Sequence, residues 1–308
     1  LHASGECLWT SADWAWMGGL ANVLLPGLYQ GVPVVAHRMA KFDPDGAFDL
    51  MRRHEVRNVF LPPTALKFMR QSPVPGGLHL RSVASGGEAL GAENYEWGRS
   101  ALGVRINEFY GSTECNLVLG NCASVEPPVL HSTGRAIPGK DVCVLGPDGT
   151  VLGAGEVGEF AVRRGDPAMF LGYWGAPEKT ASKYVGDWML MGDEGHLDAQ
   201  GRAFFSARTD DVIMSSGYRI GPSEIEDCLS GHDDVALAAA IGVPDADRGE
   251  VVKAFVVLAD GASLDEVGLI EHVRQRLSPH LAPREVVAID ALPMTATGKI
   301  MRRELKAY

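Results

Sequence analysis

Apolar positions in the first 125 residues follow two periods, one typical of strands and one typical of helices. The strand-like runs are residues 32–37, 58–63, 80–87 and 104–111. The helix-like stretches are residues 43–56, where Phe48, Met51 and Val56 share one face, and residues 92–102. Because strand and helix patterns take turns along the chain, we expect a mostly parallel sheet that is covered by helices.

The pattern changes after residue 125. Residues 142–152 contain strand-like runs on both sides of a Pro-Asp-Gly turn, and residues 157–164 follow as a further strand. Short strands that are joined by turns predict a small antiparallel sheet or barrel for residues 126–207.

The last hundred residues mix both patterns. Residues 221–232 favour a helix with Pro222 near its start, and residues 235–243, 251–258 and 285–289 favour strands. Residues 263–277 predict an amphipathic helix, and the expected apolar face consists of Leu264, Val267, Ile270, Val273 and Leu277. These elements predict a compact α+β domain.

The fold class is therefore α/β, with three regions. We expect an α/β subdomain over residues 1–125, which would be part of an incomplete large domain. A β-rich subdomain of the same domain would cover residues 126–209, and a C-terminal α+β domain residues 210–308. The weakest junction falls in residues 206–213, where Asp210 and Asp211 separate two regions with sheet-like patterns.

Composition narrows the classes of partner and compartment. The chain has 308 residues, a net charge of −11 and a pI of about 5.3, which argues against a broad nucleic-acid surface. Its most apolar stretch is interrupted by polar residues and prolines, so we expect no membrane span. Five scattered cysteines favour a reducing, cytoplasmic location. Because residue 1 is Leu and the opening segment reads like the middle of a domain, we expect a missing N-terminal portion.

Two glycine-containing loops are the first candidates for chemistry. The segments SGGEAL (85–90) and NEFYGSTE (107–114) each follow a predicted strand, and the carboxyl edge of an open α/β sheet commonly binds ligands. Glycines allow close approach of the backbone, and consecutive N–H groups can hold a phosphate. Glu114 could hold Mg²⁺ beside that phosphate, and Tyr110 could stack on a base. Both loops could equally be ordinary turns, with Tyr110 in the core.

Further candidates lie downstream, and each has an ordinary structural alternative. Asp193 could accept hydrogen bonds from ribose hydroxyls, or it could belong to a hairpin turn. Arg208 and Arg219 could recognise phosphate, or they could be solvated surface cations. Lys299, in the segment PMTATGKIMRREL, could stabilise a developing negative charge, or it could be inert.

The order of these segments carries more information than any one of them. GGEAL, YGSTE, GEFAVRRGDPAMFLGYW, MGDEGHLD, ARTDDVIMSSGYRIGPSEIE and PMTATGKIMRREL occur in one series, and together they resemble the C-terminal two-thirds of the adenylate-forming superfamily. GYRIGPSEIE and PDADRGEVVKAFVVL look most like medium-chain acyl-CoA synthetases, with benzoate-type ligases next.

The resemblance implies an ATP-dependent acid–thiol ligase that uses ATP, Mg²⁺, coenzyme A and a small carboxylic acid. It implies an adenine and α-phosphate site formed by Gly87, Glu88, Ala89, Glu108, Phe109, Tyr110, Gly111, Ser112 and Thr113. Thr113 and Glu114 would act in catalysis, with Glu114 as the metal carboxylate. Asp193 would hold the ribose, and Arg208 and Arg219 would contact the sugar or the phosphates.

The resemblance also implies a moving C-terminal domain. Lys299 would bridge the carboxylate and the α-phosphate during adenylation. Rotation about a hinge at Asp210 would then replace it with the segment that forms the thiol tunnel. The residues that would contact coenzyme A there are Ser216, Gly217, Tyr218, Arg248 and Arg274.

The sequence departs from the family pattern in ways that leave alternatives open. The family's Ser/Thr/Gly-rich phosphate loop lies upstream of residue 1, so we expect little or no adenylation by this polypeptide alone. Met191, Ala207 and Met294 replace a usual threonine, glycine and lysine. The alternatives are a degenerate homologue that only binds AMP or CoA, and an adenylation partner that loads a carrier protein. A homo-oligomer also remains open.

Overall fold

The computed structural model describes residues 6–39, 41–295 and 300–308. The chain forms two compact units. The larger unit comprises Leu1–Met191 and His196–Phe205, and the smaller unit comprises Gly192–Gly195 and Ser206–Tyr308. Each unit has its own buried clusters and is described by itself below. The expected domain boundaries and the hinge at Asp210 remain predictions, because compactness alone does not locate a hinge.

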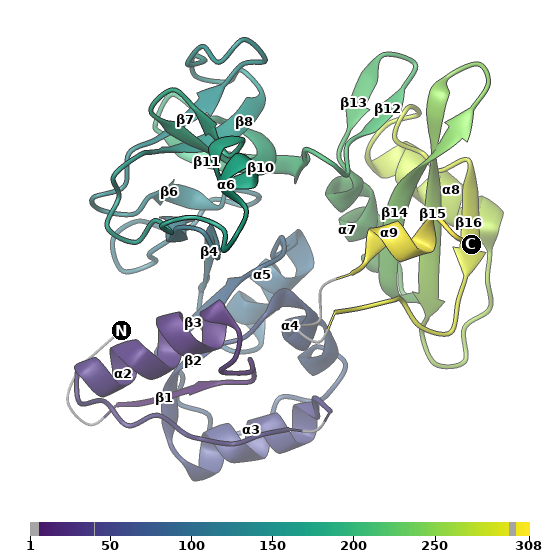
Figure 1. Cartoon of the computed structure of the whole chain (residues 1–308). Helices are drawn as coiled ribbons and strands as arrows, with labels where there is room; N and C mark the ends of the chain where they lie inside the picture. Colours follow the sequence, from purple (N-terminus) through teal and green to yellow (C-terminus); the bar gives the residue numbers. More distant parts are fainter. Residues whose placement is uncertain (1–5, 40, 296–299) are drawn as a thin grey trace. The chain divides into compact units, whose positions relative to one another are not determined.

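The larger unit contains one long sheet with helices along its first part (Figure 1). Its strands are β1 (Cys7–Thr10), β2 (Val56–Phe60), β3 (Ser82–Gly86), β4 (Ile106–Ser112), β5 (Asn116–Gly120), β6 (Gly134–Ala136), β7 (Val142–Leu145), β8 (Gly158–Arg163), β9 (Tyr184–Val185), β10 (Trp188–Leu197) and β11 (Arg202–Arg208). Its helices are α1 (Met17–Gly19), the π-helical turn η1 (Leu20–Leu24), α2 (Leu25–Tyr29), α3 (Pro44–Arg53), α4 (Pro63–Met69), α5 (Ala92–Ser100) and α6 (Pro177–Ala181).

The first four strands are parallel, and each face of this part of the sheet is covered. Neighbouring residues of β2 point to opposite faces. Val59 packs in a buried cluster with apolar side chains of α3 and α4, such as Met51 and Leu66. Phe60 packs in a second cluster with Val23 of η1. The parallel, helix-covered sheet that the sequence predicts is therefore confirmed.

The remaining strands continue this sheet in antiparallel fashion. β5 pairs antiparallel with β4 and β6, β6 pairs antiparallel with β11, and β7 pairs antiparallel with β8. The strand order over the described residues is β1-β2-β3-β4-β5-β6-β11-β10-β8-β7, and β9 pairs with β10. This path is open, so the antiparallel region is an extension of the sheet and does not close into a barrel. A third cluster around Phe160 and Met189 forms its core.

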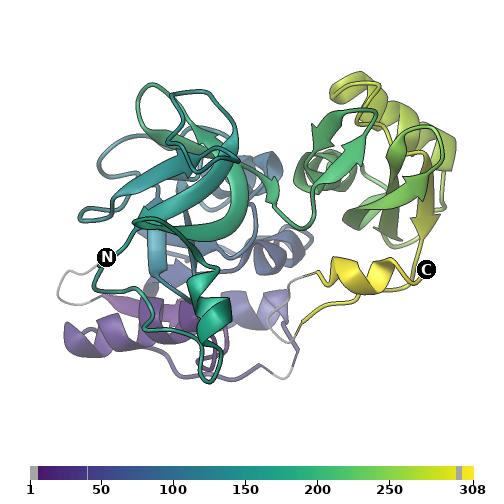
Figure 2. The same cartoon turned by 45° about the horizontal axis from the view of Figure 1, so that its top comes forward.

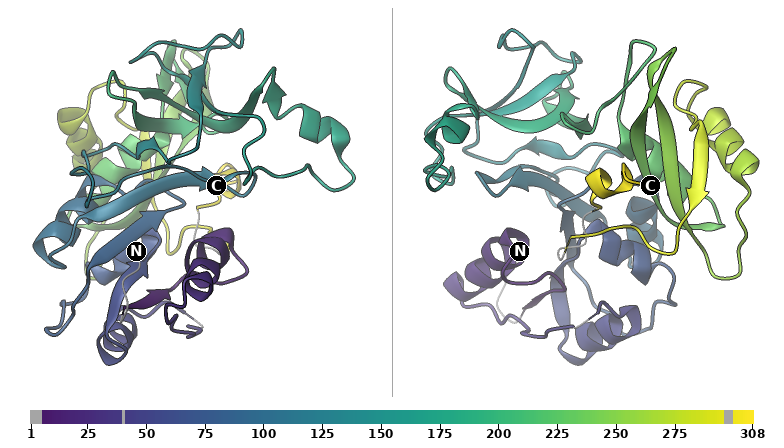
Figure 3. Two further views of the ribbon diagram at one scale, coloured as in Figure 1. Left: turned by 90° about the vertical axis from the view of Figure 1, so that its left-hand side faces the viewer. Right: turned by 45° about the vertical axis from the view of Figure 1, so that its right-hand side comes forward.

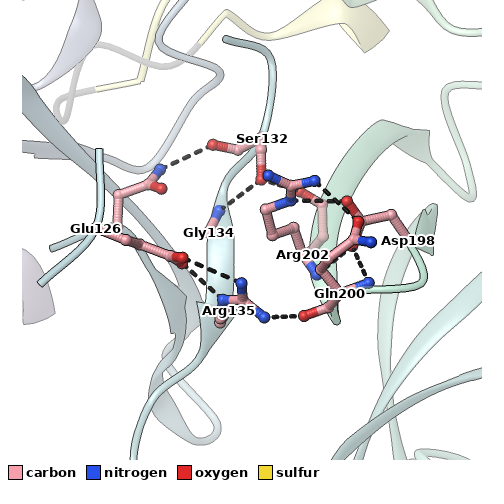
Figure 4. Close-up of polar contacts among 9 residues, drawn as sticks. Glu126, Ser132, Gly134, Arg135, Asp198, Gln200 and Arg202 are labelled. Atoms are coloured by element: carbon pink, nitrogen blue, oxygen red, sulfur yellow. Dashed lines mark hydrogen bonds and ion pairs between the residues drawn. The ribbon is translucent and has the colours of Figure 1, made fainter. Parts of the chain in front are cut away.

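Polar side-chain contacts stabilise the pairing of β6 with β11 (Figure 4). The guanidinium of Arg135 donates to both carboxylate oxygens of Glu126, at 2.6 and 3.0 Å, and to the carbonyl oxygen of Gln200. Arg202 donates to Asp198 at 2.7 Å within the turn before β11. A Cβ atom at Gly134 would lie 2.1 Å from the carbonyl oxygen of Gly120, so only glycine fits between the strands here.

The smaller unit is an α+β structure. Its strands are β12 (Ile213–Ser215), β13 (Tyr218–Ile220), β14 (Val235–Asp245), β15 (Gly249–Leu258) and β16 (Glu285–Ala288), and its helices are α7 (Pro222–Ser230), α8 (Glu266–Arg276) and α9 (Arg302–Leu305). The strand order is β13-β12-β15-β14, and β16 lies parallel to β15. Ala238 and Ala240 of β14 face α7 and α8, whereas Ile241 packs in a separate cluster with Leu305 of α9. Figures 2 and 3 show α8 and α9 on opposite sides of these strands.

Two local expectations are wrong, and a third is partly wrong. Residues 32–37 form no strand, because Val34 makes only an isolated bridge with Leu8. Val151 likewise makes only an isolated bridge with Leu145, so the run after the Pro-Asp-Gly turn is not a full strand. Among the described residues, no helix is both long and apolar enough to cross a membrane.

The expected apolar face of α8 is only partly correct. Val267 is 77% exposed, and Leu264 lies before the helix begins. Val273 is buried and Ile270 packs against the same cluster, as expected, but the other buried position is Leu269, which the expected face did not include. Leu269 and Val273 are four residues apart and therefore share one face. Residues 263–277 contain two overlapping apolar stripes, and the helical spacing could not decide which of them faces the sheet.

Candidate functional site

The two glycine-containing loops lie at one edge of the sheet. β3 and β4 are parallel neighbours in register, with Ser85 opposite Glu108 and Gly86 opposite Phe109. The segments that leave their carboxyl ends therefore start side by side, at the edge where open α/β sheets bind ligands.

The loop after β3 is fixed from both sides. Gly87 has a φ of 99°, a conformation that side chains with a Cβ rarely adopt. Glu88 accepts a 2.8 Å hydrogen bond from the Thr64 hydroxyl, and the Leu90 N–H donates to Oε1 of Glu108 at 3.1 Å. Ala89 lies between these two attachments. The loop that should line the adenine is thus bonded directly to the strand that should hold the phosphate.

The turn between β4 and β5 depends on a close backbone approach. A Cβ at Gly111 would lie 1.9 Å from the carbonyl oxygen of Asn116, so no larger residue fits. Ser112 lies at the end of β4, with its hydroxyl 3.7 Å from Sγ of Cys115, and Thr113 is exposed. This turn therefore carries two hydroxyl side chains, a residue type that phosphate sites commonly use.

Two aromatic residues of β4 contribute to packing as well. The ring of Tyr110 lies 6.0 Å from that of Phe160 and packs against the antiparallel core, although the residue is only half-buried. The ring of Phe109 lies 5.2 Å from that of Phe60. Both rings therefore contribute to the packing of the sheet. An adenine base could contact only those parts of the two rings that are not covered by Phe60 and Phe160.

Glu114 is held by one short segment of chain, residues 170–173. Its Oε1 accepts a 2.7 Å hydrogen bond from the hydroxyl of Tyr173, and its carbonyl oxygen accepts a 2.6 Å bond from the N–H of Phe170. Burial raises the pKa of Glu114, but hydrogen bonds from Tyr173 and Ser112 outweigh it, and the pKa lies below its usual value. Burial and the bond to Glu114 raise the pKa of Tyr173 to about 12. Glu114 is therefore ionised and Tyr173 neutral at pH 7.

A single ionised carboxylate suits Mg²⁺ that is shared with a phosphate. Mg²⁺ is usually bound by one or two carboxylates together with phosphate oxygens and water, rather than by a dense cage of side chains. Within the described residues, no three His, Cys, Asp or Glu side chains gather as a metal site. The donor set at Glu114 therefore fits a nucleotide-linked Mg²⁺.

Asp193 and Glu194 lie in β10, in the stretch Gly192–Gly195 that belongs to the smaller unit, and both form ion pairs with arginines. Asp193 is only 8% exposed, and Nε of Arg208 lies 3.8 Å from its Oδ1 and 3.0 Å from Oδ1 of Asp210. Arg219 forms an ion pair with the buried Glu194. Arg208 and Arg219 are thus both paired with protein carboxylates, and about half of each side chain is exposed.

The residues expected to contact coenzyme A are partly brought together. Ser216 and Gly217 form the tip of the β12–β13 hairpin with φ values of 49° and 83°. The N–H of Ser216 donates to the carbonyl oxygen of Arg248 at 2.8 Å, so Arg248 lies beside this tip. The ring of Tyr218 stacks on His280 with centroids 4.5 Å apart.

The three remaining predicted residues, a coenzyme A contact, the hinge and the catalytic lysine, do not lie at this hairpin tip or are not described. Arg274 lies on α8, where its guanidinium forms a 2.7 Å ion pair with Glu271. Asp210 is exposed, in the turn between β11 and β12. Lys299 lies outside the described residues.

Sequence reasoning missed Tyr173, Thr64 and His280. The only available signal was the GYW triplet, which we used to identify the family without assigning a role to its tyrosine. Thr64 and His280 contact predicted site residues from distant parts of the chain, and no local pattern marks them.

Two family models and several known proteins match this chain. Residues 2–174 match the family model for AMP-binding enzymes, and residues 224–299 match the model for the C-terminal domain of AMP-binding enzymes. The chain is 37% identical to the mitochondrial acyl-coenzyme A synthetase ACSM2 of Rattus norvegicus and 34% identical to the acetyl-coenzyme A synthetase of Bacillus subtilis. Both matches cover 98% of this chain and 54% of the relative, so the chain spans about half the length of these relatives.

Solved structures give the same result. A benzoate CoA ligase from Burkholderia xenovorans is 31% identical with a TM-score of 0.88, covering 99% of this chain and 62% of that one. ATP-bound MatB from Rhodopseudomonas palustris is 30% identical with a TM-score of 0.87, covering 98% of this chain and 60% of that one. With a family model matched over more than half of its length, this chain belongs to the AMP-binding enzyme family.

Proposed function

We propose that this chain forms part of an ATP-dependent acid–thiol ligase, an acyl-CoA synthetase. In the first half-reaction, a carboxylate oxygen of the acid attacks the α-phosphorus of ATP, which gives an acyl-adenylate and pyrophosphate. In the second half-reaction, the thiol of coenzyme A attacks the acyl carbon and AMP leaves. The names of the similar proteins, ACSM2, acetyl-CoA synthetase and benzoate CoA ligase, support this reaction class.

The observation that carries the proposal is the joined pair of loops at the carboxyl edge of β3 and β4. The bond from Leu90 to Glu108 sets the Gly87–Ala89 backbone beside the strand that leads to Ser112 and Glu114. Such an edge would give one ligand a flat base platform and a phosphate site. Mg²⁺, when bound by Glu114, would neutralise phosphate charge.

The remaining residues have proposed roles that follow from their chemistry. Asp193 would accept from the ribose hydroxyls, and Arg208, whose side chain is about half exposed, would contact the same sugar or phosphate. Lys299 would lie between the two anionic reactants and reduce their repulsion. Rotation about Asp210 would separate the two half-reactions.

The nucleotide part of the proposal can be tested without turnover. Calorimetry with AMP and with 2′-deoxy-AMP should show a preference for AMP, because the deoxy ligand lacks one donor to Asp193. Loss of a hydrogen bond to a charged group corresponds to roughly a tenfold to hundredfold loss of affinity. Asp193→Ala should bind both ligands about equally. Failure of the unaltered chain to bind AMP would contradict the proposal.

The proposed role of Lys299 can be tested by measuring the two half-reactions separately. In the complete enzyme, Lys299→Ala should abolish formation of the acyl-adenylate yet largely retain thioester formation from a supplied acyl-AMP. An equal loss of both half-reactions would show that Lys299 does not act in the first one. Asp210→Pro should impair the transition between them, because proline fixes φ at the proposed hinge.

Coenzyme A is favoured over a carrier protein as the thiol donor. Arg248 lies beside the tip of the β12–β13 hairpin, where a guanidinium would suit the nucleotide of coenzyme A. Arg248→Ala should therefore raise KM for coenzyme A but leave KM for pantetheine unchanged. Equal effects on both thiols would favour a carrier protein. We also propose a cytoplasmic location, since all five cysteines are free thiols.

A further inference from the structure

We propose that Tyr173 is a positioning residue that restricts how Glu114 can bind a divalent cation, and that it thereby favours Mg²⁺ over Ca²⁺. The inference rests on the proposed function, because it concerns the cation that Glu114 would share with a nucleotide phosphate.

The segment around Tyr173 holds Glu114 at two points. The Tyr173 hydroxyl donates to the carboxylate at 2.7 Å, and the Phe170 N–H donates to the carbonyl oxygen of the same residue at 2.6 Å. The Phe170 and Tyr173 rings are packed edge to face with centroids 4.9 Å apart. Backbone and side chain of Glu114 are therefore oriented together by four consecutive residues.

Ion pairing anchors the start of this segment. Nζ of Lys140 donates to Asp166 at 2.6 Å and to the carbonyl oxygen of Cys115 at 3.1 Å, and both ionic side chains are at least 90% buried. Cys115 directly follows Glu114 in the chain. One cation thus joins the segment before Phe170 to the turn that carries Glu114.

The far end of the segment is fixed by Thr180. The Tyr173 N–H donates to the Thr180 hydroxyl at 2.9 Å, and the Lys179 ammonium lies 4.7 Å from the centre of the Tyr173 ring. By contrast, Leu171 and Trp174 are fully exposed on either side of Tyr173. The left view of Figure 3 shows the region around α6 projecting beyond the strands. Tyr173 is therefore held by specific polar contacts and not by burial in a core.

The phenol bond affects which cation suits the carboxylate. Oε1 of Glu114 accepts from Tyr173, so a cation that grips both oxygens has to displace or distort that bond. Ca²⁺ accepts bidentate carboxylates and six to eight oxygen ligands, whereas Mg²⁺ requires a compact octahedron and takes one carboxylate oxygen readily. Tyr173 consequently disfavours bidentate binding, which Ca²⁺ prefers, and does not hinder binding through one carboxylate oxygen, which suits Mg²⁺.

The test compares two tyrosine variants in the full chain. Mn²⁺ binding in the presence of AMP is followed by electron paramagnetic resonance, and Mg²⁺ and Ca²⁺ are used as competitors. In Tyr173→Phe, the preference for Mg²⁺ over Ca²⁺ should fall roughly threefold to tenfold, less than the full value of one hydrogen bond to a charged group, because a bidentate cation can distort this bond without breaking it. The matched control is Tyr184→Phe, since the Tyr184 hydroxyl donates to Sδ of Met169 in the same region. Its cation preference should equal that of the unaltered chain.

The ratio of the two competition constants distinguishes positioning from a loss of folded protein, because unfolding lowers both in parallel. An unchanged ratio in Tyr173→Phe, or an equal change in both variants, overturns the inference and leaves the proposed function intact. A chain that binds neither AMP nor Mn²⁺ contradicts the proposed function itself. Should Tyr173→Phe not fold, Thr180→Val keeps the phenol but removes its backbone anchor, and the ratio should fall in the same direction. A ratio that does not fall in Thr180→Val also overturns the inference.

Discussion

Arg302 should be one of the most important side chains for the stability of the smaller unit. Its guanidinium donates through Nε and a terminal nitrogen to both carboxylate oxygens of Glu226, at 3.0 and 2.7 Å, and through the other to Asp211 at 3.1 Å. Glu226 also accepts from the Ala240 N–H at 2.9 Å. One arginine therefore joins α9, α7 and the turn before β12.

The cost of removing this arginine follows from the burial of its partners. Loss of one member of a buried ion pair costs about 3–5 kcal/mol, because the other member keeps its charge without a partner. The three side chains are 9–24% exposed, so water would recover part of that loss. We expect Arg302→Met to destabilise the smaller unit by about 2–3 kcal/mol. Arg302→Lys should recover less than half of this lost stability, because one ammonium group cannot reproduce the three hydrogen bonds that the planar guanidinium makes.

The assay exploits the distribution of tryptophans. All six lie in the larger unit, at residues 9, 14, 16, 97, 174 and 188. In urea unfolding, tryptophan fluorescence should therefore report the larger unit, whereas far-UV circular dichroism reports both. Arg302→Met should lower the urea midpoint of a dichroism transition by about 1–2 M and leave the fluorescence midpoint unchanged.

Two results would refute this reasoning. A fluorescence midpoint that falls as far as the dichroism midpoint would show that Arg302 does not act within the smaller unit alone. An unchanged dichroism curve would show that the three contacts contribute little. The Asp211→Asn variant gives an internal check, since its effect should largely disappear in the Arg302→Met background.

Three other predictions concern single sites. Gly111→Ala should disrupt the β4–β5 turn and weaken AMP binding at least tenfold by calorimetry, because the new Cβ would lie 1.9 Å from the Asn116 carbonyl oxygen; normal AMP affinity would contradict this. Phe255→Ala should cost about 3–5 kcal/mol in the dichroism transition, since this side chain is fully buried. Cys143, whose pKa burial and Asp141 raise to about 11, should be alkylated by iodoacetamide far more slowly at pH 8 than the exposed Cys122, and faster as the pH approaches 11. Peptide mass spectrometry would measure both rates, and equal rates at pH 8 would be the contrary result.

The sequence predicted those elements whose patterns had one interpretation. The parallel strands at residues 58–63, 80–87 and 104–111 are apolar runs between helical stretches, and both faces are indeed covered. Residues 32–37 have the same β-rich composition but contain Pro33, which has no N–H to donate. Only Val34 bridges to Leu8, so composition alone overestimated the extent of pairing.

The candidate site shows a sharper division between local and tertiary information. Glu114 could be chosen from the sequence because glycine, two hydroxyl residues and a carboxylate follow one another at a strand end. The orientation of its carboxylate, however, depends on Tyr173, which is 59 residues away in the chain and lies in a segment without regular structure. A tyrosine in such a segment has no periodicity that would predict its contacts. The sequence therefore identifies a plausible metal ligand, whereas the preference among metals that we propose depends on a tertiary contact that only the structure reveals.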